Sequence, residues 1–389
     1  MKKRILVLGY FGYQNNQLDG QTIKTRNVYA LLKQIYGEEV FYFDTQILSK
    51  RNNVWKMLSA LLHCEKLVYL PASRNLKWIF PFLFLLSNII RFDIIYVVIG
   101  GWIGTFLKSN PLHCFMLRHI WAILSETALM RKLLMEQFHF NNVALLSNFR
   151  ISDYTPVLST HNKFKLVFMA RVNRLKGLDY IFNLAKYLTQ QSVQPHITID
   201  FYGPIYFEDR EYFLTEVGKY PFISYKGELN PSEINKVLNQ YDLMLFPTQY
   251  YTEGLPGTII DAFMSGIPVI ATEWLHAHEF IINGMTGYII PFKGGQELFN
   301  QRIMYLYENM NVLMQMKKSA VETGKRFSHH IAGLVLKHAI DYGVDAKLSD
   351  YYDINYPPHQ NSKRRFSESE VFKISERGLI TDLVSFSAA

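Results

Sequence analysis

The sequence predicts an α/β protein built from two doubly wound domains. Short apolar runs typical of buried strands alternate with amphipathic stretches typical of helices, and the whole pattern occurs twice along the chain. The length of 389 residues is enough for two domains of ordinary size, each with its own hydrophobic core. We therefore expect a parallel, helix-covered sheet in each half.

The first half begins with a buried strand at residues 4–9, and further strands are expected at residues 40–44, 92–100 and 141–149. A long helical region is expected after the glycines at 100–101. Between the first two strands, apolar residues on one helical face predict an amphipathic helix, namely Ile23, Val28, Leu31, Leu32 and Ile35.

The second half repeats the alternation. Its predicted strands lie at residues 164–170, 197–203, 222–227, 242–247 and 268–272. Its predicted helices lie at residues 177–188, 209–220 and 231–240 and from residue 296 onward. The expected domains are residues 1–155 and 156–344, followed by a tail at 345–389 that prolines and charges interrupt. In such sheets, ligands bind beyond the carboxyl ends of the strands.

The composition describes a globular protein, with 49% apolar residues and mixed charges. Cys64 and Cys114 lack the spacing of a metal site and predict reduced thiols in a reducing compartment. The apolar run near the N-terminus is followed by the polar residues 14–17, so we expect a strand there rather than a signal peptide. No uninterrupted apolar run reaches the roughly 18 residues that a membrane span needs.

Positive charge is concentrated in the first half of the chain. Residues 1–160 contain 18 lysines and arginines against 9 acids, a net charge of +9, whereas the remainder has 23 against 24, a net charge of −1. An anionic partner of the first half is expected, and nucleic acid and an anionic membrane surface are the two candidates. The apolar run 78–90, flanked by Lys77 and Arg91, is either a buried helix or an element that enters a membrane surface.

Two cations follow the first strand of the second half. Arg171 and Lys176 precede a predicted helix, where the helix dipole disfavours positive charge. Such cations are favourable if they hold an anion at the helix N-terminus, and the alternative is a pair of solvated surface charges.

A second motif, "TEGLPGTIIDAFMSGIPVIATEW", occupies residues 252–274. Its Gly-Pro-Gly turn lets backbone amides approach a ligand, and Glu253 and Asp261 provide acceptors for sugar or ribose hydroxyls. A simpler interpretation is a capping box in which Thr258 caps a helix and Asp261 replaces the usual Glu or Gln.

Together these features describe a nucleotide-sugar site. The second half resembles the family 4 glycosyltransferases. These are retaining enzymes of the GT-B fold, in which two Rossmann-like domains face each other across a cleft. The resemblance rests on Arg171, Lys176, the acids Glu253 and Asp261, and the run 279–291. The resemblance covers about residues 164–291. A weaker one joins the first half to bacterial capsular and exopolysaccharide transferases through residues 21–32, 97–104 and 143–150.

The resemblance implies roles for the matching residues. Arg171 and Lys176 would neutralise the diphosphate, Glu253 would hold the donor sugar, and Asp261 would bind the ribose. Further donor-binding positions are implied at Gly20, Gln21, Thr22, Tyr225, Gly227, Leu229, Gly254, Leu255, Pro256, Gly257 and Thr258.

The implied activity is metal-independent transfer of a sugar, most simply from a UDP-sugar, to a saccharide or lipid-linked saccharide in bacterial surface polysaccharide synthesis. No cofactor and no nucleic acid partner are expected, and the enzyme would work in the cytoplasm at the inner face of the membrane. We interpret His276, His278 and Glu279 as a polar loop rather than as metal ligands.

Some positions depart from the family pattern. The second acid is Asp261 rather than Glu, the first loop keeps only Gly20 of a glycine pair, and residues 273–279 replace a common Gly-Gly. Gly100-Gly101-Trp102 stands where many members carry a first-domain histidine.

Other function classes stay open at this point. A nucleotide-sugar epimerase or a phosphorylase could use the same two-domain plan, and a binder without activity would share the site. A dehydrogenase would need Gly-x-Gly-x-x-Gly after the first strand, where this chain offers only Gly9 and Gly12.

Overall fold

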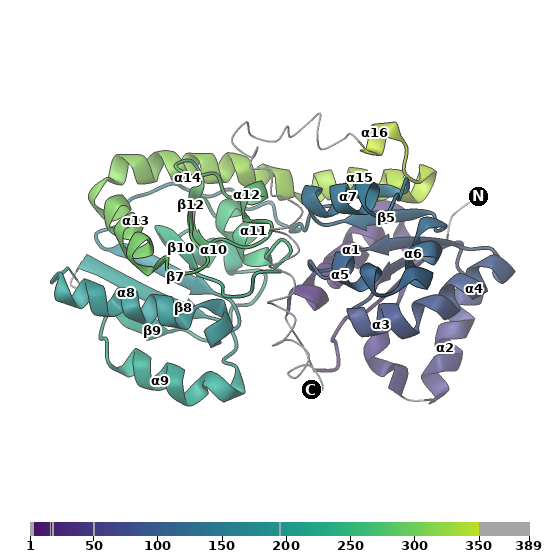
Figure 1. Cartoon of the computed structure of the whole chain (residues 1–389), viewed down its shortest axis with the longest axis horizontal. Coiled ribbons are helices and arrows are strands. Elements are labelled where there is room, and N and C mark those ends of the chain that lie inside the picture. Colours follow the sequence, from purple (N-terminus) through teal and green to yellow (C-terminus); the bar gives the residue numbers. More distant parts are fainter. Residues whose placement is uncertain (1–3, 16, 18, 50, 194–195, 350–389) are drawn as a thin grey trace. The chain divides into compact units, whose positions relative to one another are not determined.

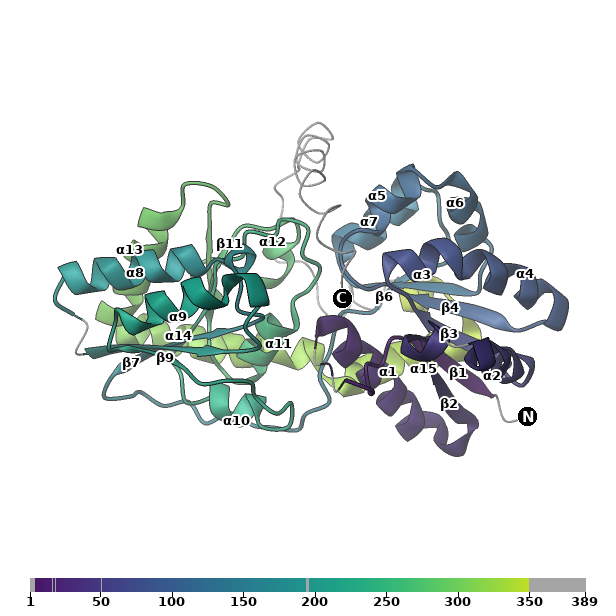
Figure 2. The same ribbon diagram turned by 90° about the horizontal axis from the view of Figure 1, so that it is seen from below.

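The computed structural model describes residues 4–349, apart from residues 16, 18, 50 and 194–195, and these residues form two units (Figures 1 and 2). Within the described range, the first unit comprises residues 4–151 and 329–349, and the second comprises residues 152–328. Each unit contains one six-stranded parallel sheet with helices around it, which confirms the predicted fold class.

The first sheet has the strand order β2-β1-β3-β4-β5-β6. Its strands are β1 (Ile5–Gly9), β2 (Val40–Asp44), β3 (Lys66–Leu70), β4 (Asp93–Val97), β5 (Ala122–Ser125) and β6 (Val143–Leu145). The sequence analysis missed β3 and β5. The long helical region expected after residues 100–101 was wrong, because β5 interrupts it and separates two short helices from a third.

Side chains of β1 alternate between the two faces of this sheet. Leu6 and Leu8 belong to one apolar core, whereas Ile5 and Val7 belong to the other. Both faces are therefore buried under helices. The helices of this unit are α1 (Gly20–Tyr36), α2 (Arg51–Leu62), α3 (Ser73–Trp78), α4 (Phe80–Ile90), α5 (Ile103–Lys108), α6 (Pro111–Arg118), α7 (Ala128–Glu136), α15 (His329–Tyr342) and α16 (Ala346–Ser349).

The second sheet has the order β12-β11-β10-β7-β8-β9. Its strands are β7 (Phe164–Met169), β8 (Ile197–Tyr202), β9 (Ile223–Tyr225), β10 (Leu243–Phe246), β11 (Val269–Thr272) and β12 (Gly287–Ile290). Five of them were predicted, and β12 was missed. Its helices are α8 (Leu178–Gln190), α9 (Arg210–Gly218), α10 (Ile234–Leu238), α11 (Gly257–Met264), α12 (Ala277–Phe280), α13 (Gln296–Glu308) and α14 (Met310–Gly324).

Helix α15 belongs to the first unit, although the sequence analysis placed residues up to 344 in the second domain. Its apolar residues share a core with those of α1, and Trp121 Nε1 donates a 2.8 Å hydrogen bond to the Ala339 carbonyl. Tyr36 Oη donates to Asp341 at 3.1 Å. The chain therefore returns to the first sheet after the second is complete (Figure 2). Most of the predicted tail, residues 350–389, lies outside the described residues.

The apolar run 78–90 forms the end of α3 and all of α4, and it is only half buried. Phe80 and Leu83 lie in the core, whereas Trp78, Leu85 and Ile89 are exposed. Within the described range, none of the helices combines the length and the apolar character needed to cross a bilayer. Cys64 is buried, and burial raises the pKa of its thiol to about 12.

A buried carboxylate holds the beginning of the second sheet together. Asp242, which directly precedes β10, accepts hydrogen bonds from the Lys165 amide of β7 at 2.9 Å and from Lys317 Nζ of α14 at 2.7 Å. His161 Nδ1 lies 3.0 Å from the same carboxylate. Lys317 also donates to the Ser159 carbonyl at 3.1 Å. The side chains of Asp242 and Lys317 are almost fully buried, so each charge needs the other to offset its loss of hydration.

We predict that Lys317→Met destabilises the second unit by about 3–5 kcal/mol, because Asp242 would keep a buried charge without its counter-ion. Lys325→Met is the control, since Lys325 pairs with Glu322 at the surface and its loss should cost less than about 1 kcal/mol. Urea unfolding measures the free energy of unfolding of both variants, and hydrogen exchange of peptides from β7 and β10 locates the change. Equal unfolding midpoints for the two variants would contradict the prediction.

Candidate functional site

The loops that follow the strands of the second sheet are joined to one another by backbone hydrogen bonds. The Val172 amide donates to Pro204 O at 2.9 Å, and the Gly203 amide donates to Gly227 O at 2.9 Å. The Gln249 amide donates to Leu175 O at 2.7 Å. The loops after β7, β8, β9 and β10 therefore form one continuous rim at the carboxyl ends of the strands, where ligands bind in such sheets.

A close backbone contact fixes two of these loops. Gly177 has φ +86°, and a Cβ at this position would lie 1.9 Å from the Pro247 carbonyl oxygen, so only glycine fits. Lys176 comes just before this contact, and Glu253 lies six residues beyond Pro247. The contact thereby brings two predicted site residues, which are distant in sequence, to the same place.

Lys176 and Glu253 form an ion pair through Nζ and Oε1. The two side chains are 24% and 13% exposed, so the pair is partly shielded from water but open on one side. Asn173 Oδ1 accepts a hydrogen bond from the Lys176 amide at 2.9 Å, and Thr248 Oγ1 lies 3.4 Å from Glu253 Oε1. The first bond fixes the backbone of Lys176, and the second contact restrains the Glu253 carboxylate.

Helix α11 begins at Gly257, with Pro256 as its N-cap residue. The capping-box interpretation of Thr258 and Asp261 was wrong. Thr258 lies inside the first turn. Its hydroxyl donates a 2.6 Å hydrogen bond to the Met169 carbonyl at the end of β7. Pro256, the N-cap residue, makes no capping hydrogen bond with its side chain. An uncapped helix start of this kind suits an anion.

Asp261 is buried, one turn into α11, with 3% of its surface exposed. Its backbone carbonyl accepts a 2.6 Å hydrogen bond from Ser265 Oγ, and Asn235 Nδ2 of α10 donates to Ser265 Oγ at 3.0 Å. This network fixes the register of α11 against α10. Asp261 comes eight residues after Glu253, which lies in the loop between β10 and α11.

The remaining predicted residues of the second unit have different surroundings. Arg171 follows β7 and is exposed. Tyr225 ends β9, and its hydroxyl donates to the Gly203 carbonyl at 3.0 Å. Burial, and secondly the charge of Glu228, raises the pKa of Tyr225, so its phenol stays protonated as a donor. Leu255 is buried in the core and Leu229 packs against that core, so only their backbones can serve a ligand.

Gly254 is fixed from outside the loop. The buried indole of Trp274 donates from Nε1 to the Gly254 carbonyl at 3.1 Å. Trp274 belongs to the segment 273–279 that departs from the family pattern, and it therefore supports the Gly-Pro-Gly turn from behind.

The predicted residues of the first unit lie where β1 leads into α1. Helix α1 begins at Gly20, and Asp19 caps it by accepting from the Thr22 amide at 2.9 Å. The Thr22 side chain is fully buried, and its hydroxyl donates to the Asp19 carbonyl at 2.9 Å. The amides of Gly20 and Gln21 remain the ligand-facing candidates of this loop.

The sequence analysis missed a buried ion pair in the first unit. Lys24 Nζ of α1 lies 2.7 Å from Glu126 Oε1 and donates to the Val98 carbonyl at 2.9 Å. Glu126 directly follows β5, and Val98 follows β4, so the pair lies at the carboxyl ends of the first sheet. Recognising the short strand before Glu126 would have drawn attention to it.

The histidines of residues 273–279 form two separate pairs. His276 Nδ1 lies 3.2 Å from Glu279, and His278 Nε2 lies 3.1 Å from Glu273. In the part of the chain that the structure describes, these side chains do not gather into a cluster of three possible metal ligands.

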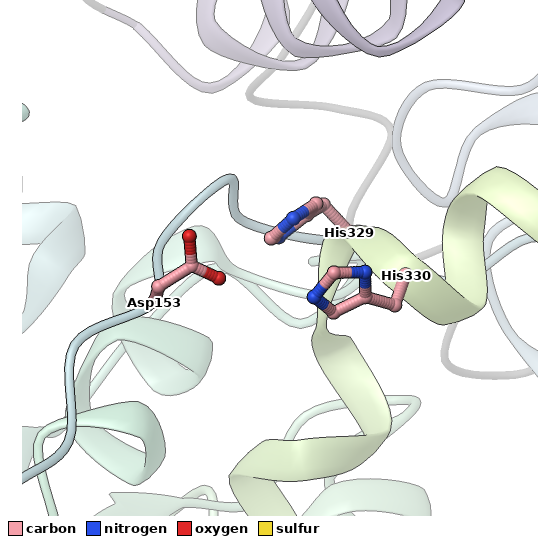
Figure 3. Close-up of side chains that lie close together, drawn as sticks. All are labelled: Asp153, His329 and His330. Carbon is pink, nitrogen blue, oxygen red and sulfur yellow. The ribbon is translucent and has the colours of Figure 1, made fainter. Parts of the chain in front are cut away.

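Figure 3 shows two further histidines, His329 and His330, at the beginning of α15 with ring centroids 4.0 Å apart. The third labelled residue, Asp153, belongs to the second unit and the histidines to the first. We assign no ligand site to these three side chains.

Residues 154–323, nearly the whole second unit, match the family model of the glycosyl transferases group 1. Two curated relatives are the amylovoran biosynthesis glycosyltransferase AmsK of Erwinia amylovora and the putative colanic acid biosynthesis glycosyltransferase WcaL of Salmonella typhimurium. The first is 22% identical over 44% of this chain and 43% of AmsK, and the second is 27% identical over 34% of each chain. The alignments thus span less than half of these relatives.

Solved structures match over more of the chain. Anabaena HepE, crystallised with UDP and glucose, aligns with a TM-score of 0.66 and 16% identity over 87% of this chain and 100% of HepE. Sucrose-phosphate synthase of Thermosynechococcus elongatus aligns with a TM-score of 0.67 and 12% identity over 86% of this chain and 98% of the synthase. This chain therefore has the GT-B fold, and its residues 154–323 are similar to the glycosyl transferases group 1.

Proposed function

We propose that this chain is a retaining glycosyltransferase. It transfers a sugar from a nucleotide diphosphate, most simply UDP, to a saccharide or lipid-linked saccharide used in surface polysaccharide synthesis. The observation that carries the proposal is the Lys176–Glu253 pair in the rim of the second sheet, with Glu253 in the loop that leads into α11.

Each part of this rim suits one part of a nucleotide sugar. The amides at the start of α11 and the cations Arg171 and Lys176 attract the diphosphate. Glu253 and Asp261 accept hydrogen bonds, from sugar and from ribose hydroxyls respectively. The loop after the edge strand β9, with the phenol of Tyr225 and the backbone of Gly227, would take the base; it adjoins the loop after β8 through the Gly203–Gly227 hydrogen bond.

The relatives support the class of donor and product. HepE was crystallised with UDP and glucose. The pneumococcal O-GlcNAc transferase GtfA was crystallised with UDP and GlcNAc. GtfA aligns with a TM-score of 0.59 and 17% identity over 74% of this chain and 59% of GtfA. AmsK and WcaL are named for the synthesis of amylovoran and colanic acid. These names favour UDP as the nucleotide and a polysaccharide as the product.

In the proposed mechanism, the bond between the anomeric carbon and the diphosphate oxygen breaks while the acceptor hydroxyl attacks from the same face and passes its proton to the departing diphosphate oxygen. Negative charge then grows on the departing diphosphate. Arg171, Lys176 and the α11 amides stabilise that charge where it develops. Glu253 keeps Lys176 at the rim before the donor arrives and orients the sugar afterwards.

The same groups can replace a divalent metal ion. A metal-dependent transferase neutralises the diphosphate with a cation held by several oxygen ligands. Here the carboxylate of Glu253 already pairs with Lys176. We therefore propose that protein cations, rather than a metal, neutralise the leaving group.

The first prediction concerns donor binding. UDP at about one hundred times its dissociation constant should stabilise the protein by about 2.7 kcal/mol, which is visible as a thermal shift, and GDP should do so less. Asp261→Asn should bind UDP about tenfold or more weakly, because an amide accepts a ribose hydroxyl bond less well than a carboxylate. Glu216→Gln is the control, since Glu216 pairs with Lys219 on α9. Isothermal titration calorimetry measures the affinities.

Two results of this experiment would count against the proposal. A chain that binds no nucleotide in a screen of UDP, GDP and their sugars would remove it. An Asp261→Asn protein that melts lower yet binds UDP like the wild type would show that Asp261 is structural only.

The second prediction concerns turnover. Arg171→Ala and Lys176→Ala should each lower the rate about a hundredfold or more, since one preorganised group of this kind is worth about 3 kcal/mol in the transition state. Glu253→Gln should also lower the rate. Arg174→Ala is the matched control in the same loop, because Arg174 pairs with Asp179 at the surface, and its rate should stay within about twofold. Release of the nucleotide diphosphate in the presence of EDTA measures each variant.

Loss of activity in EDTA with recovery in Mn²⁺ would contradict the metal-independent mechanism, above all if both cation variants stayed near the wild-type rate. Donor binding without any turnover, across a panel of saccharide acceptors, would instead favour a binder that has lost its activity.

A further inference from the structure

We infer that the face formed by α3, α4 and α6 of the first unit is a docking surface for an anionic lipid bilayer. This inference does not depend on the proposed glycosyl transfer. It begins from α4, which is apolar on both of its faces, although only one face is buried.

The exposed face of α4 is unusually apolar. Phe82, Leu85 and Ile89 follow each other at spacings of three and four residues, so they lie on one side of the helix. Leu85 is 64% exposed and Ile89 is 76% exposed. Single exposed apolar residues are ordinary, whereas a row of them on one helix face indicates an interaction surface.

Neighbouring helices extend this face. Helices α3 and α6 lie next to α4 in both views (Figures 1 and 2). His113 Nε2 of α6 lies 3.1 Å from the Lys77 carbonyl of α3, which fixes the two helices together. Trp78 of α3 is 70% exposed, and Leu112 and Phe115 of α6 are 61% and 54% exposed. We call these three residues with Phe82, Leu85 and Ile89 the apolar face.

The charges in this region favour an anionic partner. Residues 71–118 contain a single acid, Asp93, and its carboxylate is paired with Lys66 at 2.6 Å. The same residues contain five cations, Arg74, Lys77, Arg91, Lys108 and Arg118. Lys77 Nζ lies 5.5 Å from the centroid of the Trp78 ring, so a cation adjoins an exposed aromatic residue. Apolar side chains next to cations match the interface of an anionic bilayer.

The dimensions favour a helix that lies in the membrane surface. Helix α4 has 11 residues and is therefore about 16 Å long, roughly half the hydrocarbon thickness of a bilayer. Its inner face already packs on the core through Phe80 and Leu83. The side chains of the apolar face would enter the headgroup region while the helix stays attached to its domain.

The test is co-sedimentation of the full chain with vesicles of phosphatidylcholine alone or with about one third phosphatidylglycerol. We expect binding to the anionic vesicles that weakens as salt rises. Leu85→Glu and Ile89→Glu should each lower the partition coefficient about tenfold or more. Lys77→Glu should lower it about fivefold or more, the equivalent of one cation at an anionic surface.

Matched controls lie in the second unit. Phe207→Glu changes a side chain that is 87% exposed, and Lys219→Glu changes a lysine that is 53% exposed. Both should bind vesicles like the wild type. A bromolipid should quench tryptophan fluorescence, and Trp78→Phe should abolish most of that quenching.

Three outcomes would overturn the inference. Equal binding to neutral and anionic vesicles would remove the electrostatic part, and variants of the apolar face that bind like the controls would place the contact elsewhere. A wild-type dimer that Leu85→Glu converts to a monomer, without vesicle binding by either protein, would show that a second copy of the chain covers this face. None of these outcomes depends on turnover, so each is distinct from a failure of the proposed function.

Discussion

The site in the second unit depends on the contact between the Gly177 backbone and the Pro247 carbonyl. Any side chain at position 177 would collide with that carbonyl, and the positive φ angle is one that glycine adopts without strain. The contact draws the loop after β7 against the loop after β10, and the Gln249–Leu175 hydrogen bond continues it. Lys176 and Glu253 are therefore placed by backbone packing, which is rigid, and their ion pair is a consequence of that packing.

Around this contact, each loop satisfies its own polar groups and leaves the ligand side available. Thr258 donates its hydroxyl to Met169 and Trp274 holds the Gly254 carbonyl, so the turn before α11 is fixed from behind. Helix α11 then begins after Pro256, whose side chain makes no capping hydrogen bond. Preorganised donors of this kind lose little conformational entropy when they bind an anion, because their position is already determined.

Buried charges stabilise each unit at a different end of its sheet. In the second unit, Asp242 and Lys317 lie where the strands begin, away from the rim that the proposed donor would use. In the first unit, Lys24 and Glu126 lie where the strands end. Removing one member of either pair would leave a buried charge uncompensated. The Lys24–Glu126 pair thus links α1 to the segments that follow β4 and β5.

The sequence by itself predicted the two parallel sheets, since alternating apolar periods reveal strand and helix locally. It also drew attention to Lys176 and Glu253, whose side chains the structure pairs. It missed β3, β5 and β12, because short buried strands have no period that separates them from helix. Only the tertiary structure showed that Asp261 is no cap and that α15 returns to the first sheet. It also showed that α4 exposes one apolar face. These properties depend on which neighbours a side chain meets, and contacts between residues distant in sequence decide that.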